Sequence, residues 1–138
     1  KEMLGKLKKA FLMVAGGAVQ KYGPDLEGHQ QLLMAAADIL IEIYMAESTI
    51  LRTEKLAKKQ GEDTVKEQIA MAKLYLYKAV DVITQKGKES IISFAEGDEQ
   101  RMMLMGLRRF RKYTNMPNII ELRETITTKL VSENQYCF

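Results

Sequence analysis

Histidine and cysteine, which often bind metals or act as nucleophiles, each occur once in the 138 residues, as His29 and Cys137. A di-iron helical bundle needs two Glu-x-x-His pairs, and the residue three before His29 is Leu26, so a di-iron centre is excluded. One histidine and one cysteine cannot complete a zinc site, and a serine triad needs a usable histidine. The single cysteine allows no internal disulfide, which fits a reducing compartment.

Other absences narrow the function further. No uninterrupted apolar run approaches the ~18 residues that a membrane span needs, and these residues show no secretory leader pattern. The sequence also lacks a phosphate-binding glycine loop and a nucleophile elbow. We therefore expect a cytoplasmic domain that has no catalytic, cofactor-binding or metal-binding residues of its own.

The two prolines, Pro24 and Pro117, fall where the helical spacing of apolar residues breaks, and the rest of the chain has a helical pattern. The first helix is expected over residues 2–22, because the Gly-Pro pair that follows cannot continue it. Asp25 is placed to cap a second helix, which should run to Gln60, just before a glycine.

A third helix should open with a capping box formed by Thr64 and Glu67. Its apolar stripe keeps its phase through Gly87, which predicts one continuous helix to about Ala95. A break at residues 85–88 is the alternative.

Two shorter helices are expected in the last third of the chain. The fourth follows a Gly-Asp pair at residues 97–98 and should end near Tyr113. The fifth should start at Pro117 and Asn118, with Glu121 completing a second capping box. Four apolar residues of this fifth helix should face inward: Ile119, Leu122, Ile126 and Leu130.

These helices predict an all-α fold, an elongated antiparallel up-and-down bundle of four to five helices. A second helix of 35 residues would span roughly 50 Å, whereas a compact globule of this length is only about 35–40 Å across. The second and third helices should therefore form a long antiparallel pair. The adjacent glycines Gly16 and Gly17 in the first helix suggest close packing against another helix. The apolar pattern is present from Leu4 onward, and the first residue is Lys1 instead of an initiator methionine. We therefore expect 1–138 to be one domain from the C-terminal part of a longer chain.

The fourth helix carries two contrasting faces. Met103, Gly106, Leu107 and Phe110 form an apolar stripe. The opposite face is cationic, with apolar Leu104 and Met105 also pointing outward. We predict that this face is a docking surface, consisting of Arg101, Leu104, Met105, Arg108, Arg109 and Lys112.

The positive charge of the chain is concentrated in this helix. Residues 101–112 carry five basic groups and no acid, whereas the remaining residues carry a small excess of acids. Acids at the start of a helix and bases at its end also suit the helix dipole, so a merely solvated face is the second interpretation. Binding to anionic lipid headgroups is a third interpretation, for which one face of four turns is a modest surface. Nucleic acid is not expected, because the surface outside this helix carries an excess of acids.

Two polar residues lie on the apolar face of the second helix. Glu47 has apolar neighbours on both sides in the helical projection, so we expect a buried carboxylate with a partner such as Arg101, Lys73 or a tyrosine. A structural ion pair is the favoured interpretation, and a general base in a pocket is the alternative. His29 is expected to be a buried, hydrogen-bonded residue at the end of the bundle, about 27 Å from Glu47 and too distant to act with it.

Three stretches together resemble a known family: Lys9–Lys21 (KAFLMVAGGAVQK), Ala46–Lys55 (AESTILRTEK) and Ser93–Phe110 (SFAEGDEQRMMLMGLRRF). They are similar to the extra C-terminal helical domain of bacterial acyl-CoA dehydrogenases related to the very-long-chain enzymes. The similarity covers nearly the whole chain, but none of the three stretches is a chemical motif.

The resemblance implies a parent enzyme of fatty acid β-oxidation, a flavoprotein oxidoreductase that converts fatty acyl-CoA to trans-2-enoyl-CoA. Its glutamate base and FAD would belong to upstream catalytic domains. The present bundle would be a non-catalytic assembly domain without a cofactor, packed against those catalytic domains on the surface that other members use to pair dimers into tetramers. A homodimer of the parent is a further expectation. The alternative is an independent bundle that binds proteins or anionic membrane surfaces. Peripheral membrane association would need a strongly hydrophobic amphipathic segment, and the sequence shows none.

Overall fold

The structure, a computed structural model, describes residues 2–138, and these contain five α-helices and no strand. Two short 3-10 turns, η1 (Gly23–Gly28) and η2 (Glu62–Val65), connect the first three helices. The predicted all-α fold is therefore confirmed. The helices are α1 (Glu2–Tyr22), α2 (Gln30–Gln60), α3 (Lys66–Phe94), α4 (Gly97–Phe110) and α5 (Ile119–Glu133).

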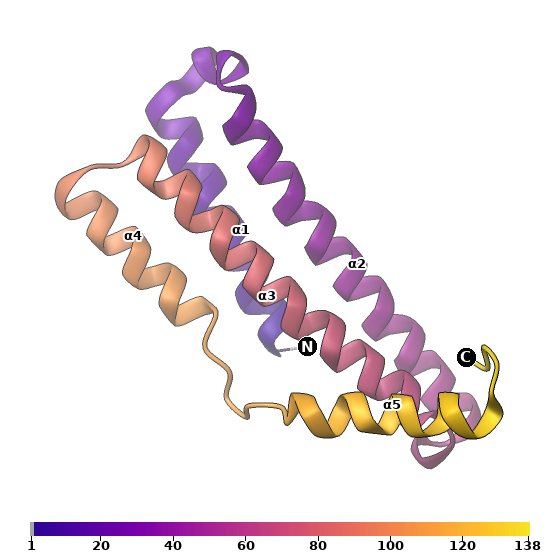
Figure 1. The fold of residues 1–138 in the computed structure, drawn as a ribbon. Coiled ribbons are helices and arrows are strands. Elements are labelled where there is room, and N and C mark those ends of the chain that lie inside the picture. The colour runs from indigo at the N-terminus through magenta and orange to yellow at the C-terminus, as the bar shows by residue number, and fades with distance from the viewer. Residues whose placement is uncertain (1) are drawn as a thin grey trace.

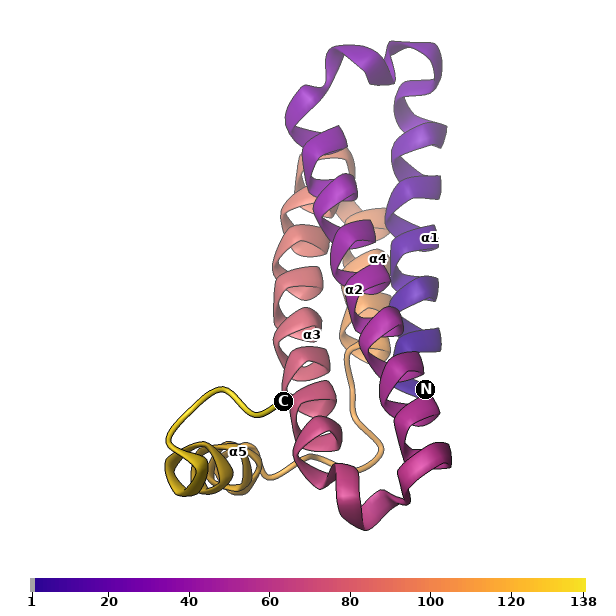
Figure 2. The ribbon, with the colours of Figure 1, turned by 90° about the vertical axis from the view of Figure 1, so that its right-hand side faces the viewer.

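Helices α1 to α4 run alternately up and down along one long axis, and α2 and α3 form the predicted antiparallel pair (Figure 1). Helix α5 departs from this arrangement. Figure 2 shows α5 end-on while the other helices are seen from the side, so α5 crosses the end of α3 instead of running along the bundle. The segment between α4 and α5 is not helical and contains Pro117, which allows the chain to turn out of the bundle direction.

The buried apolar side chains form two clusters at different heights of the bundle. The first joins the start of α1 to the middle of α2 and α3, around Leu7, Ile39 and Ile83. The second joins the end of α1 to α3 and α4, around Val14 and Ile91. Because side chains of this size contribute about 1.5–3 kcal/mol each when buried, these clusters are the main source of stability. They include the residues of α1 and α3 that recur at helical spacing, such as Leu4, Leu7 and Val14 of α1 and Val80 and Ile83 of α3.

The link between α1 and α2 differs from the prediction at Asp25. Helix α1 ends at Tyr22 as expected, with Gly23 at a φ of +51°. Asp25 then lies inside η1, and α2 begins only at Gln30, without a side-chain cap. The capping prediction for Asp25 is wrong because the Gly-Pro pair starts a 3-10 turn, which delays the helix by several residues beyond the reach of this carboxylate.

Helix α3 is continuous through Gly87, as the sequence predicted, and Leu107 of α4 packs closely over this glycine. The capping box expected at its start is not formed. Thr64 lies in η2, and the residue before α3 is Val65, which has no side-chain cap hydrogen bond. Glu67 is buried instead, and its carboxylate lies 3.9 Å from Lys129 of α5. The crossing helix therefore provides the partner of this carboxylate.

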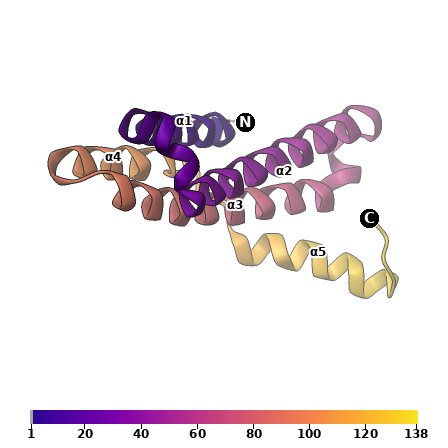
Figure 3. The ribbon, with the colours of Figure 1, turned by 90° about the horizontal axis from the view of Figure 1, so that it is seen from above.

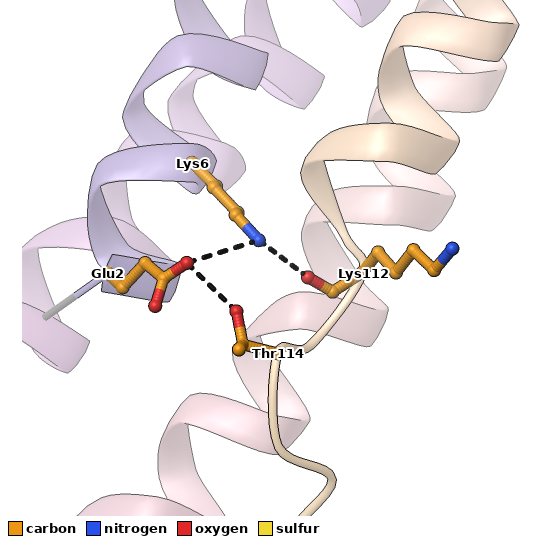
Figure 4. A network of polar contacts seen from close by, with 4 residues as sticks. All are labelled: Glu2, Lys6, Lys112 and Thr114. Atoms are coloured by element: carbon orange, nitrogen blue, oxygen red, sulfur yellow. Dashed lines mark hydrogen bonds and ion pairs between the residues drawn. The ribbon is translucent and has the colours of Figure 1, made fainter.

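Helix α4 ends at Phe110, three residues earlier than expected. The chain that leaves it is tied to the start of α1 (Figure 4). Lys6 donates a hydrogen bond of 3.0 Å to the carbonyl of Lys112, and Thr114 donates one of 2.9 Å to Glu2. These contacts hold the segment in a non-helical path towards α5.

Helix α5 has the cap that the sequence predicted. The side chain of Asn118 accepts a hydrogen bond of 3.2 Å from the backbone N–H of Glu121. Its apolar face is only partly covered: Ile119, Leu122 and Ile126 are half-buried, and Leu130 is exposed rather than inward. A single crossing contact with α3 cannot cover the full length of this face.

Candidate docking surfaces

Helix α4 has the two faces that the sequence indicated. Leu107 is buried in the second cluster, and Met103 and Phe110 pack against that cluster. On the other side Met105 is 61% exposed, next to the exposed Arg108 and Arg109. Acids in the first turn and these arginines in the last turn both interact favourably with the helix dipole.

Three members of the predicted docking surface are placed differently from the expectation. Leu104 is half-buried against the second cluster, because it lies one turn before Leu107 on the side that faces α3. Arg101 forms an ion pair of 3.5 Å with Asp98 in its own helix. Lys112 lies beyond the end of α4, and Figure 4 shows its side chain pointing away from the network that holds its carbonyl.

Two adjoining hollows lie between α3 and α4, and cations line both of them. The smaller, of about 230 Å³, includes Lys88, Arg108 and Arg111. The larger, of about 550 Å³, shares the two arginines and also includes Lys112. Within residues 2–138, no ion pair is recorded for any of these four side chains. The smaller hollow can attract an anionic group, whereas Asp81 also lines the larger one and offsets part of its positive charge.

Tyr113 lines the larger hollow and has an unusual environment. Burial, together with the nearby Asp81 and Tyr77, raises the pKa of Tyr113 from its ordinary value of 10.0 to about 12. The hydroxyl oxygen is buried and has no recorded hydrogen-bond partner. A phenol held so firmly in its neutral form cannot act as a base near neutral pH.

The predicted burial of Glu47 in α2, and of His29 directly before α2, is wrong. Glu47 is half-exposed, and its partner is Lys8 of α1, at 2.8 Å, rather than the expected residues. It was expected to be buried because apolar residues surround it on the helix, but part of that apolar face is itself exposed. His29 is exposed at the end of the bundle and stacks on Tyr22, with ring centroids 3.7 Å apart.

A second surface, which was not predicted from the sequence, lies on the outer side of α2. Large apolar residues are exposed along most of this helix, the most exposed being Tyr44 at 69%. The signal was present in the sequence, because the apolar residues of α2 occupy more than the one face that a bundle needs to bury. The exposed set consists of Leu33, Met34, Leu40, Ile41, Tyr44, Met45 and Leu51.

The described residues do not fit a metal or a dinucleotide cofactor. No three His, Cys, Asp or Glu side chains come together anywhere in residues 2–138. A pyrophosphate is usually held at a glycine-rich helix start, but α4, which opens at Gly97, has acidic neighbours at Glu96, Asp98 and Glu99. The start of α4 therefore lacks the features of a pyrophosphate site. None of the helices in residues 2–138 is long and apolar enough to cross a bilayer.

Comparisons with known proteins agree on one family. The family model for the acyl-CoA dehydrogenase C-terminal domain matches residues 6–109. A Bacillus subtilis (strain 168) protein named probable acyl-CoA dehydrogenase is 33% identical over 136 residues, which is 99% of this chain but 23% of that protein. The crystal structure of a Bacillus anthracis acyl-CoA dehydrogenase complexed with FAD is similar with a TM-score of 0.93 and 35% identity, again over 99% of this chain and 23% of that one.

Proposed function

The chain belongs to the acyl-CoA dehydrogenase C-terminal domain family, and we propose that it is the non-catalytic assembly domain of a FAD-dependent acyl-CoA dehydrogenase. The observation that supports this most directly is the match over 99% of this chain to only 23% of a relative whose crystal structure holds FAD. In this proposal residues 1–138 form one domain of a longer cytoplasmic polypeptide.

The chemistry of the parent enzyme lies in its other domains. A carboxylate base there would remove the α-proton of a fatty acyl-CoA while a hydride passes from the β-carbon to FAD, giving the trans-2-enoyl-CoA. The present helices would provide stiffness and contact area. We also propose that the enzyme belongs to the very-long-chain subfamily and forms a homodimer, as the similarity of the three sequence stretches implies.

The cationic surface of α4 provides one contact in this proposal. Met105, Arg108 and Arg109 are exposed, and no ion pair among residues 2–138 involves either arginine. We propose that they face an acidic patch on the catalytic portion of the same polypeptide. None of the relatives reported above is described as an independent interaction or membrane-binding module.

A flavin measurement tests the assignment. The full-length polypeptide should contain about one FAD per chain, and added fatty acyl-CoA should bleach its absorbance. The 138-residue chain prepared alone should contain none, because its residues form no dinucleotide site. Stoichiometric FAD in the isolated chain, or none in the full-length polypeptide, would overturn the proposal.

A charge-reversal pair tests the α4 contact. Arg108→Glu with Arg109→Glu in the full-length enzyme should loosen the bundle, seen as faster proteolysis between the bundle and the catalytic portion. Lys58→Glu with Lys59→Glu is the matched control, since these lysines also occupy the last turn of a helix. Equal rates of proteolysis in the arginine and lysine variants would contradict a specific contact. A second contradicting result would be salt-sensitive co-sedimentation of the enzyme with anionic vesicles that only the arginine variant loses.

A further inference from the structure

The outer side of α2 is free of charge over a long distance. From Leu33 to Leu51 the helix rises by about 27 Å. At 100° per residue, seven large apolar residues in this stretch share one side with Ala37 and Ser48, and no charged residue joins them. In Figure 2 no helix lies in front of α2, and the seven apolar residues are all exposed. We call it the outer face.

The charged residues of this stretch are all engaged with other helices of the bundle. Asp38 pairs with Lys86 of α3 at 3.7 Å, and Glu42 accepts a hydrogen bond of 3.0 Å from Tyr75. Glu47 pairs with Lys8 of α1 at 2.8 Å. An exposed helix face normally carries such charges itself, and their absence removes the usual protection against association.

The apolar surface continues onto α1. Leu12 and Val19 lie on the same side of α1 as Lys8, and both are more than half exposed. Lys8 pairs with Glu47, which lies at the edge of the outer face. Leu12 and Val19 therefore border the outer face from the neighbouring helix α1. Figure 3 shows α1 on one side of α2 and α3 on the other.

The combined surface has the size of an apolar patch that often marks a contact site. Seven side chains of α2, each between 37% and 69% exposed, together present several hundred Å² of apolar surface, on the order of what one partner contributes to a stable interface. At about 25 cal/mol per Å² its removal from water is a strong driving force for docking.

The width of the surface indicates the kind of partner. A two-stranded coiled coil uses a narrow seam of residues spaced three and four apart. Here the exposed residues cover well over a third of the circumference of α2 and extend onto α1, so the matching surface is formed by more than one helix. Tyr44 adds a rigid aromatic group with a polar tip, and Met34 and Met45 are flexible enough to fit an uneven surface.

We propose that the outer face, with Leu12 and Val19, docks onto an apolar helical surface of the catalytic portion of the same polypeptide. This inference rests on the proposed function. The chain spans 23% of the length of its relatives, so the occupant is a large body that is covalently tethered. Tethering gives it an effective concentration that a second copy reaches only at high protein concentration.

A photocrosslinking experiment identifies the occupant. p-Benzoylphenylalanine in place of Tyr44 in the full-length enzyme should crosslink to peptides of the catalytic portion. The matched control carries the same group in place of Tyr136, which is 83% exposed and lies in the C-terminal segment, away from the outer face. We expect the residue-44 group to give about tenfold more of this product.

Three results would overturn the inference: a crosslink from residue 44 to α1 or α2 of a second copy, yields from residues 44 and 136 that are equal, or no crosslink from either position. The failure of the proposed function is separate from these. It would appear as a full-length protein without FAD or acyl-CoA oxidation, whichever peptide residue 44 reaches.

Discussion

At the scale of single residues, the adjacent glycines of α1 have opposite surroundings. A Cβ added at Gly17 would lie 2.9 Å from Cζ of the buried Phe94 and 2.7 Å from Cε of Met103. A Cβ at Gly16 would meet nothing within 4 Å. The close packing that the sequence suggested for the pair therefore applies to Gly17 alone.

This difference predicts opposite effects of the same substitution. Gly16→Ala should stabilise the chain by about 0.5–1 kcal/mol, because alanine favours a helix. Gly17→Ala should be less stable than Gly16→Ala by about 1–3 kcal/mol, since the ring of Phe94 must move. Urea unfolding of both variants measures the difference, and equal stabilities would contradict the packing described for α1 and α3.

The ion pair between Lys8 and Glu47 should contribute little. Both side chains are more than a third exposed, so water screens the attraction. Glu47→Gln should therefore cost less than about 1 kcal/mol, where a buried carboxylate would have cost several. A double-mutant cycle with Lys8→Met provides the measurement, and a coupling energy well above that limit would show that Glu47 is buried after all.

Tyr113 predicts a pH dependence at the alkaline end. The unfolded chain ionises this phenol near its ordinary pKa of 10.0, whereas in the folded chain burial, Asp81 and Tyr77 raise the pKa to about 12. Its contribution to stability is thus fully present below pH 10 and is lost as the pH rises to about 12. Between pH 8 and pH 11 the urea midpoint of unfolding should fall less for Tyr113→Phe than for the unchanged chain. An identical fall would contradict the environment assigned to Tyr113.

At the scale of helices, the two predicted capping boxes had different outcomes. Asn118 caps α5, while Thr64 is taken into η2 and caps nothing. Asn118→Ala should cost about 1 kcal/mol and increase hydrogen exchange at the start of α5, whereas Thr64→Ala should change neither α3 nor its stability. A larger loss from Thr64→Ala than from Asn118→Ala would contradict the helix starts described above.

Helix limits and inward stripes could be predicted from the sequence wherever local signals decide them. The ends of α1 and α2, and the continuity of α3, followed from glycine, proline and apolar spacing. The direction of α5 could not, because its packing against α3, which includes the contact of Glu67 with Lys129, joins distant parts of the chain. The burial of Leu104 and the exposure of Glu47 were mispredicted because a helical projection gives a residue's direction but not which helix covers it.

At the scale of the whole molecule, the chain combines a well-packed interior with two surfaces suited to contact. The cationic surface of α4 was evident from the sequence because five basic residues and no acid fall within residues 101–112. The outer face of α2 was not recognised, since its apolar residues have the same spacing as a buried stripe and only the three-dimensional arrangement shows that no helix covers them. In this account the molecule is a rigid bundle that docks onto a catalytic body.

The most direct test is calorimetric unfolding of the full-length enzyme with flavin fluorescence recorded in parallel. Introducing Ile41→Glu with Tyr44→Glu should separate the bundle into its own transition, about 5 °C or more below the other, with FAD released only in the upper one. The matched pair Ile120→Glu with Tyr136→Glu, at exposed positions of α5 and the C-terminal segment, should leave a single transition. A single unchanged transition in the α2 variant, or release of FAD together with the bundle, would contradict the account.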